Sequence, residues 1–380
     1  MKICTITCHR VYNYGASLQT YALQHYIESI GHEVEIIDFN PWFHRDRYNL
    51  FWFGNNEKSI ADMAMKKFPP LQWVYLPYRA WRSGIFKTWG RKTTFDKFEK
   101  DYYHLTKTRY FSSDDLKEKP PLADVYVAGS DQIWNIQSGN GKEPGYYLDF
   151  GPKEVRRISY AASLGTSGIV KEWELFVKER VSALNSVSVR EITGVKLLQK
   201  IGIKDIFLVL DPVFLLSKEK WLELSLRAKC YGLVKNSYIL LYDFLGNDEN
   251  MQKFTLNYAK VMNLRIVSIN DFLLSKYSDI NINDAGPLEF LSLISNAACV
   301  IGSSFHATAF SVILEKEFFT FNLIGFDNSS RMKDFLESIG LKERLNPQKI
   351  LDNTINYENI LTKLQKLISF SKMFISNQLC

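Results

Sequence analysis

The order of apolar and polar residues predicts a strand, a helix and a second strand at the start of the chain. Apolar residues dominate positions 3–8, and positions 16–30 carry them at helical spacing. Gly31 is placed to end that helix, and 34–39 is a second strand. Because a short crossover helix between two strands makes them parallel, the pattern predicts a parallel sheet covered by helices.

Similar strand patterns recur and fall into two series. The expected strands are 123–128, 157–161 and 187–189 in the first series, and 207–210, 238–242, 265–269, 299–302 and 318–321 in the second, with helices at 248–262, 287–296 and 306–315. We therefore expect two α/β domains that face a cleft, an N-terminal domain over 1–205 and a C-terminal domain over 206–345. The last segment, 346–380, contains an amphipathic helix that we expect to pack back on the first domain.

The region from about 40 to 120 interrupts this pattern and is interpreted as an insertion in the first domain. Five of the eight tryptophans fall here, and residues 63–95 contain seven basic residues and no acidic one. Basic charge interleaved with Trp and Tyr is what an anionic membrane surface attracts. The alternative is a helical insertion that packs its rings on the sheet and leaves its lysines in solvent.

Composition narrows the class of protein. The 380 residues are 46% apolar and 23% charged, which is typical of a globular chain. A net charge of +6 is low for a dedicated nucleic-acid-binding domain, so we expect no nucleic-acid partner. The N-terminus does not resemble a signal peptide and no apolar run is long enough to span a bilayer, so a cytoplasmic location is expected, with peripheral contact to the inner face of the plasma membrane as an extension.

Cofactor and metal motifs are missing from the sequence. The five cysteines are scattered, without a C-x-x-C pair, and are expected to be reduced thiols with no metal bound. The first strand–helix turn contains only Gly15, so it is not a dinucleotide fingerprint, and no Walker A sequence occurs. We therefore expect no cofactor.

The segment 299–308 is the first candidate for chemistry. A buried strand runs into Ser303 and Ser304, and a helix then begins with His306 in its first turn. The unpaired N–H groups and the positive dipole of a helix start favour an anion, and His306 can bind or protonate a phosphate oxygen. The alternative is plain N-capping beside a packed imidazole.

Two more strand ends carry candidate side chains. Arg190 follows the strand at 187–189, where α/β domains bind ligands, and its planar fork suits phosphate or carboxylate. Asp131, in the Gly-Ser-Asp turn after the strand at 123–128, is a candidate base or sugar ligand. A surface salt bridge and a simple turn are the respective alternatives. Asp211, before Pro212, is interpreted as a turn former.

These pieces, in this order, resemble the polysaccharide pyruvyl transferase family over about residues 1–345. The motifs that carry the resemblance are Asn13-Tyr14-Gly15-Ala16-Ser17-Leu18-Gln19, Gly129-Ser130-Asp131-Gln132-Ile133-Trp134-Asn135, Ser188-Val189-Arg190-Glu191, Leu210-Asp211-Pro212-Val213, Ser303-Ser304-Phe305-His306-Ala307, and Arg331 through Phe335-Leu336 to Gly340-Leu341.

The resemblance implies two Rossmann-like domains in a GT-B-like arrangement, with the donor bound in the cleft on the C-terminal side. It also implies transfer of pyruvate from phosphoenolpyruvate to a sugar as a cyclic ketal, during synthesis of bacterial surface glycans. The family's donor-binding arginine falls on Arg190, and its helix-start histidine falls on His306. Some members have Arg-Leu-His where Phe305 precedes His306 here, and Arg331 or backbone amides are expected to compensate for the missing arginine.

We accordingly expect His306 to act on the donor phosphate and in proton donation, and Asp131 to hold or deprotonate an acceptor hydroxyl. The expected substrate-binding residues are Arg190, Ser303, Ser304, Asn13, Tyr14, Gly15 and Arg331. The acceptor in such pathways is typically a sugar on a polyprenyl diphosphate, a partner that the basic, tryptophan-rich region suits. Two alternatives remain open on the sequence: a GT-B-type glycosyltransferase that uses a nucleotide sugar, and a non-catalytic homologue of a glycan pathway.

Overall fold

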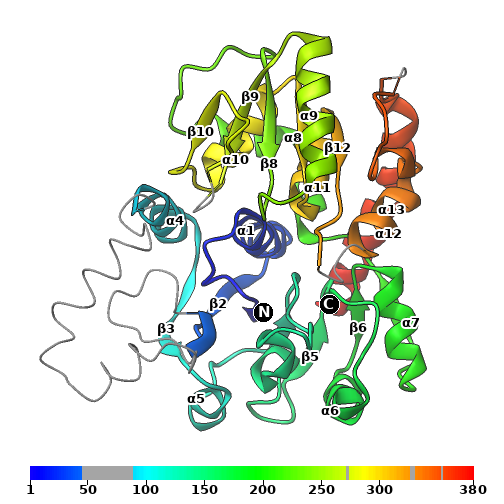
Figure 1. Cartoon of the computed structure of the whole chain (residues 1–380). Coiled ribbons are helices and arrows are strands. Elements are labelled where there is room, and N and C mark those ends of the chain that lie inside the picture. Colours follow the sequence, from blue (N-terminus) through cyan, green and yellow to red (C-terminus); the bar gives the residue numbers. More distant parts are fainter. Residues whose placement is uncertain (45–88, 271–273, 326–329, 352–353) are drawn as a thin grey trace, which may run out of the picture.

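The computed structural model describes residues 1–44, 89–270, 274–325, 330–351 and 354–380. Within these residues the chain forms two five-stranded sheets and one two-stranded sheet, and every strand pairing is parallel (Figure 1). The membrane-contact interpretation of the tryptophan-rich region depends mainly on residues 45–88, which lie outside the described residues.

The first domain is built on a sheet of strand order β3-β2-β1-β4-β5. Its strands are β1 (Lys2–Ile6), β2 (Glu33–Phe39), β3 (Leu105–Tyr110), β4 (Val125–Ala128) and β5 (Arg156–Ser159), and β6 (Val187–Val189) pairs with β7 (Ile206–Leu208) beyond β5. Its helices are α1 (Tyr14–Ser29), α4 (Trp89–Tyr102), α5 (Ser113–Glu118), α6 (Lys171–Ser182) and α7 (Ile192–Lys200), with 3-10 turns η1 (Trp42–His44), η3 (Asn140–Lys142) and η4 (Pro144–Tyr147). The central strands are apolar on both faces because helices cover both sides of the sheet.

The second domain repeats this plan with strand order β10-β9-β8-β11-β12. Its strands are β8 (Tyr238–Tyr242), β9 (Arg265–Ile269), β10 (Ile280–Ile282), β11 (Cys299–Gly302) and β12 (Glu317–Thr320). The remaining helices are η5 (Pro212–Phe214), α8 (Lys218–Ser225), α9 (Glu249–Met262), α10 (Pro287–Asn296), α11 (Phe305–Ile313), α12 (Ser330–Ile339), η6 (Lys342–Arg344) and α13 (Tyr357–Gln378). These two doubly wound domains confirm the expected fold class, Rossmann-like domains in a GT-B-like arrangement.

Two expectations about the organisation of the chain were wrong. The strand expected at 207–210 as the start of the second domain is β7, which pairs with β6 of the first, so the second sheet begins only at β8. The region 40–120 is not wholly an insertion, because β3 pairs with β2 as the edge strand of the first sheet. The sequence of β3, LTKTRY, consists mostly of polar residues. It therefore does not show the apolar run of a central strand.

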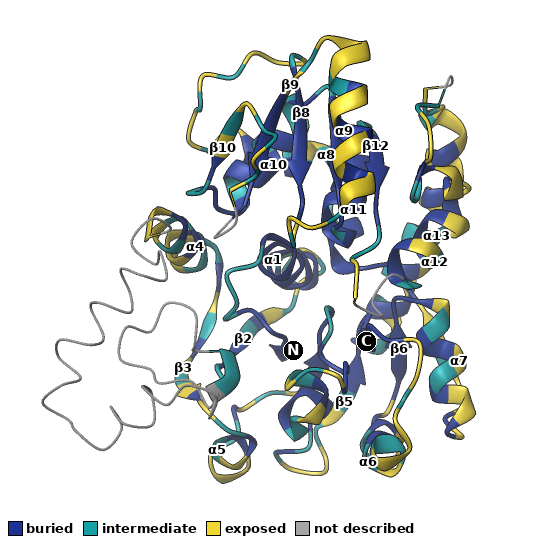
Figure 2. Ribbon diagram, viewed as in Figure 1, coloured by how far each residue is buried: buried dark blue, intermediate teal, exposed yellow. Residues whose placement is uncertain are grey.

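Helix α1 joins the two domains (Figure 1), and it is buried along nearly its whole length (Figure 2). The ring of Tyr14 stacks on Phe290 of α10, with centroids 4.6 Å apart. Arg91 of α4, expected among the basic residues of the insertion, is buried and donates to the carbonyl oxygens of Tyr12 (2.9 Å) and Ala285 (3.3 Å). The domains therefore share an apolar core around α1.

The C-terminal helix α13 lies beside α12 and runs from the second domain to the first (Figure 1). Near its start, Ile360 and Leu364 pack in the core of the second domain. Near its end, Phe374 packs on Tyr160 of the first domain, and Ser371 Oγ accepts the Leu210 N–H at 2.9 Å. None of the helices in the described part of the chain combines the length and the apolar character needed to cross a membrane.

Candidate active site

The predicted site residues lie on loops that follow parallel strands. Asp131 follows β4, Arg190 follows β6, Asp211 follows β7, and His306 is in the first turn of α11 after β11. Parallel sheets bind ligands at the carboxyl ends of their strands, where the strand order reverses. The strand order reverses between β1 and β4 in the first sheet and between β8 and β11 in the second. Asp131 and His306 follow β4 and β11, so each lies at the reversal of its own sheet.

Arg190 is the centre of the cluster, with only 1% of its side chain exposed. Its Nη1 donates to Asp211 Oδ2 and to Ser130 Oγ (3.3 Å), and its Nη2 donates to Asp131 Oδ1 (3.3 Å). The guanidinium carbon lies 4.7 Å from the centre of the Phe305 ring, at a distance typical of cation–π contact. Arg190 of the first domain is thus packed against a residue of the second.

Asp211 was interpreted from the sequence as a turn former, and the structure shows that it also contacts the cluster. Its Oδ1 accepts the Val213 N–H (3.1 Å), which closes the expected turn. Its Oδ2 faces the cluster, where it accepts from Arg190 and from Ser130 Oγ (3.0 Å) and lies 3.5 Å from His306 Nε2. The sequence signal was only an Asp-Pro pair at the end of a predicted strand, which does not distinguish the two roles.

His306 lies against the start of α1, and this contact explains Gly15. A Cβ atom at Gly15 would lie 1.9 Å from His306 Nδ1, inside any van der Waals distance. Asn13 caps α1 at the same place, where its Oδ1 accepts the N–H groups of Gly15 (2.9 Å) and Ala16 (3.2 Å). The N-termini of α1 and α11, one from each domain, therefore meet at His306.

Three of the predicted substrate-binding residues make contacts within the protein. Ser304 caps α11 by accepting the Ala307 N–H at 3.4 Å, and Ser303 Oγ accepts the Phe244 N–H at 3.3 Å. Tyr14 is 1% exposed and packs in the core between the domains, so its ring does not face the cleft. For Ser304, the alternative of plain capping describes the geometry.

Arg331 comes from α12 and is buried beside the cluster, with its guanidinium carbon 6.0 Å from the centre of the Phe305 ring. Burial lowers the pKa of Arg331 to about 10, and the charge of Arg190 acts in the same direction. Phe305 therefore carries an arginine contact from each domain. From the family resemblance we expected Arg331 to compensate here for the arginine that some members of the family have just before the helix-start histidine.

Three basic and three acidic side chains share the cluster: Arg190, Arg331, His306, Asp131, Glu191 and Asp211. Burial would raise the pKa of Asp131, but the charges of Arg190, His306 and Arg331 outweigh it and the pKa is lowered. For Glu191, burial outweighs Arg190 and raises the pKa. Of the three carboxylates in the cluster, Glu191 is therefore the one that burial favours in its neutral form.

Three buried polar atoms of the cluster make no hydrogen bond within the described part of the chain: Arg190 Nε, Glu191 Oε2 and His306 Nε2. They face charged neighbours at ion-pair distance, because Arg190 Nε lies 3.9 Å from Glu191 Oε2 and His306 Nε2 lies 3.5 Å from Asp211 Oδ2. Their hydrogen-bonding capacity is therefore open to a polar ligand.

A cavity of about 390 Å³ opens beside the cluster. It is lined by Cys8, Val11, Tyr12, Asn13, Phe43, His44, Arg91, Asp131, Gln132, Ser138, Asn140, Tyr242 and Phe244. Asp131 belongs to both the cavity and the cluster. Cys8 Sγ lies 3.6 Å from Asp131 Oδ2 as a donor, and burial together with the Asp131 charge raises the pKa of this thiol. The sequence analysis treated Cys8 with the other cysteines as a reduced thiol without a metal, and so missed this contact.

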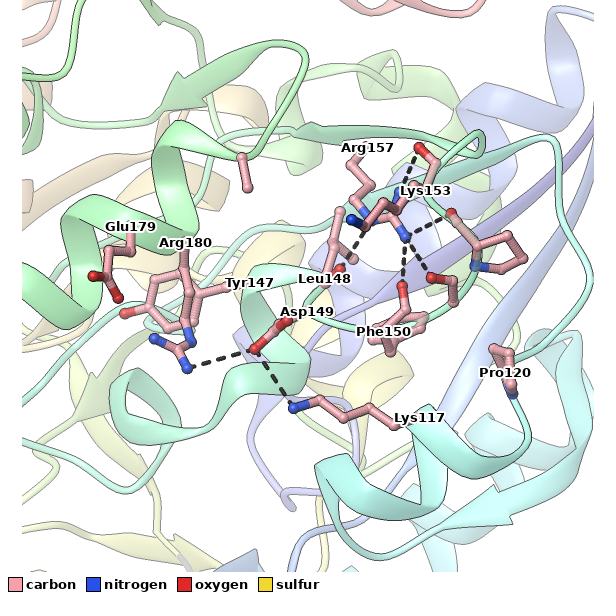
Figure 3. Close-up of a pocket in the computed structure, with 13 residues that line it drawn as sticks. Lys117, Pro120, Tyr147, Leu148, Asp149, Phe150, Lys153, Arg157, Glu179 and Arg180 are labelled. Atoms are coloured by element: carbon pink, nitrogen blue, oxygen red, sulfur yellow. Dashed lines mark hydrogen bonds and ion pairs between the residues drawn. The ribbon is translucent and has the colours of Figure 1, made fainter.

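A larger cavity, of about 910 Å³, lies on the outer side of the first domain (Figure 3). One of its two arginines, Arg157 near the start of β5, donates to backbone carbonyls, including those of Phe150 (2.6 Å) and Leu148 (3.1 Å). Asp149 lies between Lys117 (3.6 Å) and Arg180 (3.5 Å). Because this cavity is at the amino ends of the strands and contains none of the predicted site residues, it is not the candidate site.

The described residues contain no group of three or more His, Cys, Asp or Glu side chains that could hold a metal ion.

The fold and the cluster define a two-domain α/β protein with a polar site between its domains. The family model for polysaccharide pyruvyl transferase matches residues 13–323, and the chain belongs to this family.

Solved structures similar to this chain have low sequence identity. A UDP-GlcNAc 2-epimerase from Methanocaldococcus jannaschii, in complex with UDP-GlcNAc and UDP, is 13% identical over 97% of this chain and 93% of that chain, with a TM-score of 0.49. The UDP-GlcNAc 2-epimerase from Neisseria meningitidis bound to UDP-GlcNAc is 10% identical over 100% and 99%, with a TM-score of 0.48. The glycosyltransferase AviGT4, involved in avilamycin A biosynthesis, is 8% identical over 100% and 97%, also with a TM-score of 0.48. These likenesses carry no argument about function, and the curated proteins include no significant match.

Proposed function

We propose that this protein transfers pyruvate from phosphoenolpyruvate to two hydroxyls of a sugar and so forms a cyclic ketal. The observation that carries the proposal is the meeting of Arg190, Arg331 and His306 at two helix N-termini, beside a cavity between the domains. Membership of the polysaccharide pyruvyl transferase family supports the reaction class.

The donor would be held by the cationic cluster. Phosphoenolpyruvate carries a phosphate and a carboxylate, and arginine forks and helix N-termini are suited to both. On this proposal Arg190 anchors the donor, Arg331 adds the second positive charge, and His306 contacts the phosphate. Because cationic side chains neutralise the donor, the reaction requires neither a metal nor a cofactor.

The proposed chemistry balances without an outside reactant. A proton adds to C3 of phosphoenolpyruvate, and one sugar hydroxyl attacks C2 and loses its proton. The bond between C2 and the phosphate oxygen then breaks, and the second hydroxyl closes the ring on C2. The two hydroxyl protons balance the one gained by C3 and the one that leaves with inorganic phosphate. We assign proton donation to His306, which lies in the first turn of α11.

Asp131 faces both the cluster and the cavity, where a sugar hydroxyl would have to lie. Because the neighbouring cations lower the pKa of Asp131, its carboxylate stays ionised and is a weak base. We therefore propose that Asp131 accepts a hydrogen bond from the acceptor hydroxyl and orients it, in preference to removing its proton.

The acceptor would occupy the 390 Å³ cavity. Aromatic rings of Tyr12, Phe43 and Phe244 line it, together with the amides of Asn13 and Asn140. Rings that cover the apolar face of a sugar, with amides for its hydroxyls, are a suitable lining for a carbohydrate.

We propose further that the acceptor sugar is linked to a polyprenyl diphosphate, on the basis of the basic, tryptophan-rich sequence at 63–95. Sedimentation with anionic liposomes tests this directly. Wild-type protein should sediment with the vesicles, and a variant with Ala at Arg79, Arg82 and Lys87 should remain in the supernatant. Absence of the wild-type protein from the pellet would contradict the membrane proposal and leave the reaction proposal intact.

The reaction is tested by incubating the protein with phosphoenolpyruvate and a panel of saccharides, free and lipid-linked. The expected result is release of inorganic phosphate that depends on one acceptor, with a product heavier by one pyruvate less one water. The matched control is His306→Gln, which should release no phosphate. Turnover of a UDP-sugar on the same panel, with phosphoenolpyruvate untouched, would assign the protein to glycosyl transfer instead.

A further inference from the structure

Asp211 contacts the principal cation of each domain. Its Oδ2 accepts from Arg190 Nη1 of the first domain and lies 3.5 Å from His306 Nε2 of the second. We propose that Asp211 is a positioning residue of the site, which holds Arg190 and His306 in one geometry across the domain boundary. This inference rests on the proposed function only for its consequence in donor binding.

The two oxygens of Asp211 have separate tasks. The turn that begins η5 needs one acceptor, and Oδ1 supplies it to the Val213 N–H at 3.1 Å. Oδ2 takes no part in the turn and accepts from Arg190 and from Ser130 Oγ at 3.0 Å. A turn former alone would leave this second oxygen in solvent, as aspartates in surface turns do.

The burial of Asp211 shows that these contacts matter energetically. Its side chain is 0% exposed, and a buried carboxylate is tolerated only when partners compensate for the lost hydration. Burial would raise the pKa of Asp211, but His306 and Arg190 outweigh it and hold the pKa well below the ordinary value.

Other charges near His306 do not make this contact. Three other charged side chains of the cluster come from three different elements. They are Asp131 in the loop after β4, Arg190 at the end of β6 and Arg331 in α12. The first turn of α1, which packs on the ring, contains no acidic residue. Within the described residues, Asp211 is the carboxylate that the structure places within ion-pair distance of His306 Nε2.

A double-mutant cycle tests the contact without any ligand. The free energy of unfolding is measured for wild type, Asp211→Asn, His306→Gln and the double variant under one set of conditions. The effects of the two substitutions should be non-additive, because the two side chains are in contact. The matched control pairs His306→Gln with Glu317→Gln, because Glu317 is a partly buried ion-pair carboxylate at the far end of the second sheet. That control pair should be additive.

Phosphoenolpyruvate binding tests the consequence. Asn in place of Asp211 can still accept the Val213 N–H of the turn, but it lacks the charge that holds Arg190 and His306. The affinity of Asp211→Asn for phosphoenolpyruvate should therefore fall by about tenfold. Glu317→Gln should keep the wild-type affinity. A role confined to the turn would lower stability in Asp211→Asn without changing this affinity.

The outcomes separate the two proposals. If wild-type protein does not bind phosphoenolpyruvate, the proposed function is wrong, and the positioning role is then decided by the double-mutant cycle. Additive effects in the cycle, or wild-type affinity for phosphoenolpyruvate in Asp211→Asn, would overturn the positioning role. If Asp211→Asn does not fold, Asp211→Glu replaces it: the charge is kept but displaced by one methylene, and binding about tenfold weaker is expected. Wild-type affinity in that variant would also overturn the inference.

Discussion

Gly15 and His306 belong to different domains, and each limits the side chain that the other position can accept. Their contact leaves no room for a Cβ atom at Gly15, although a helix interior ordinarily favours alanine over glycine by about 1 kcal/mol. Steric exclusion therefore outweighs helix propensity at this residue. The requirement is imposed by the neighbouring domain and is independent of the backbone angles of α1.

We predict that Gly15→Ala displaces the His306 ring and weakens phosphoenolpyruvate binding by about tenfold or more, because a shift of the ring breaks the geometry at the donor phosphate. Isothermal titration calorimetry measures the change. Gly168→Ala is the control, since a Cβ there meets no atom within 4 Å. Equal affinity in the two variants would show that His306 is not held in place for the donor.

Arg190 is also part of the stability of the fold. Removing it in Arg190→Ala leaves Asp211 and Asp131 buried without their partner, and loss of one member of a buried pair costs about 3–5 kcal/mol. We expect a clear drop in the urea midpoint together with loss of donor binding. Arg344→Ala, which removes a buried partner of Glu317, should also lower the midpoint but keep donor binding. Donor binding by Arg190→Ala would contradict the role of this residue as an anchor.

The sequence could predict the residues whose chemistry is visible in a local motif. Arg190 and His306 each follow a strand that the sequence predicts. The structure brings these two residues together with Asp131 and Arg331. Asp211 and Cys8 were not recognised as members of the site because their roles depend on loops about 80 to 123 residues apart in the chain. Local patterns carry no information on such contacts.

At the scale of elements, the start of α1 has two tasks. Asn13 satisfies N–H groups that a helix start would otherwise leave unpaired, and it also lines the cavity. Replacing a capping asparagine by alanine costs about 1 kcal/mol. Asp248 caps α9 in the same way through the N–H groups of Asn250 and Met251, but it does not line the cavity.

We predict that Asn13→Ala and Asp248→Ala lower the free energy of unfolding by similar amounts, about 1 kcal/mol each. Only Asn13→Ala should also reduce the rate of phosphate release from phosphoenolpyruvate with the acceptor. Denaturant unfolding and the phosphate assay measure the two effects separately. An equal loss of activity in both variants would mean that Asn13 acts through helix stability alone.

The strands that the sequence predicted correctly are the apolar ones. Strands β8, β9 and β11 match their expected ranges because buried strands of a parallel sheet are apolar on both faces. The edge strand β3 consists mostly of polar residues. Strand β7 is short, and its residues Phe207 and Leu208 are exposed. Their assignment is fixed by pairing with strands distant in the chain, which a local pattern does not report.

At the scale of the whole molecule, α1 and α13 pack the two domains together as one unit. Each domain also contains a buried ion pair. Asp38 of β2 is one of the most strongly paired carboxylates, with Arg10 Nη2 at 2.6 Å and Arg109 Nε at 2.8 Å. Burial would raise the pKa of Asp38, but contacts with His9, Arg10 and Arg109 outweigh it and the pKa falls well below the ordinary value.

This shift has a definite sign for stability. A carboxylate whose pKa is lower in the folded state stabilises the fold above its unfolded pKa, about 3.9, and loses that contribution as pH falls towards the folded value. We predict that wild-type protein loses stability steeply below about pH 4. Asp38→Asn should be less stable at pH 7 and show a flatter profile in this acid range, as measured by urea midpoints. A profile parallel to that of wild type would show that Asp38 gains no net stabilisation from its partners.

The central claim is that a site built from both domains holds phosphoenolpyruvate through Arg190 and His306. Thermal unfolding of wild type, Arg190→Lys and His306→Gln with phosphoenolpyruvate, UDP and UDP-GlcNAc in turn tests it most directly. A ligand at 100 times its Kd stabilises the folded state by about 2.7 kcal/mol, which raises the melting temperature by several degrees. The account predicts a rise with phosphoenolpyruvate alone, in wild type and in neither variant. A rise with UDP or UDP-GlcNAc, or an equal rise with phosphoenolpyruvate in all three proteins, would contradict it.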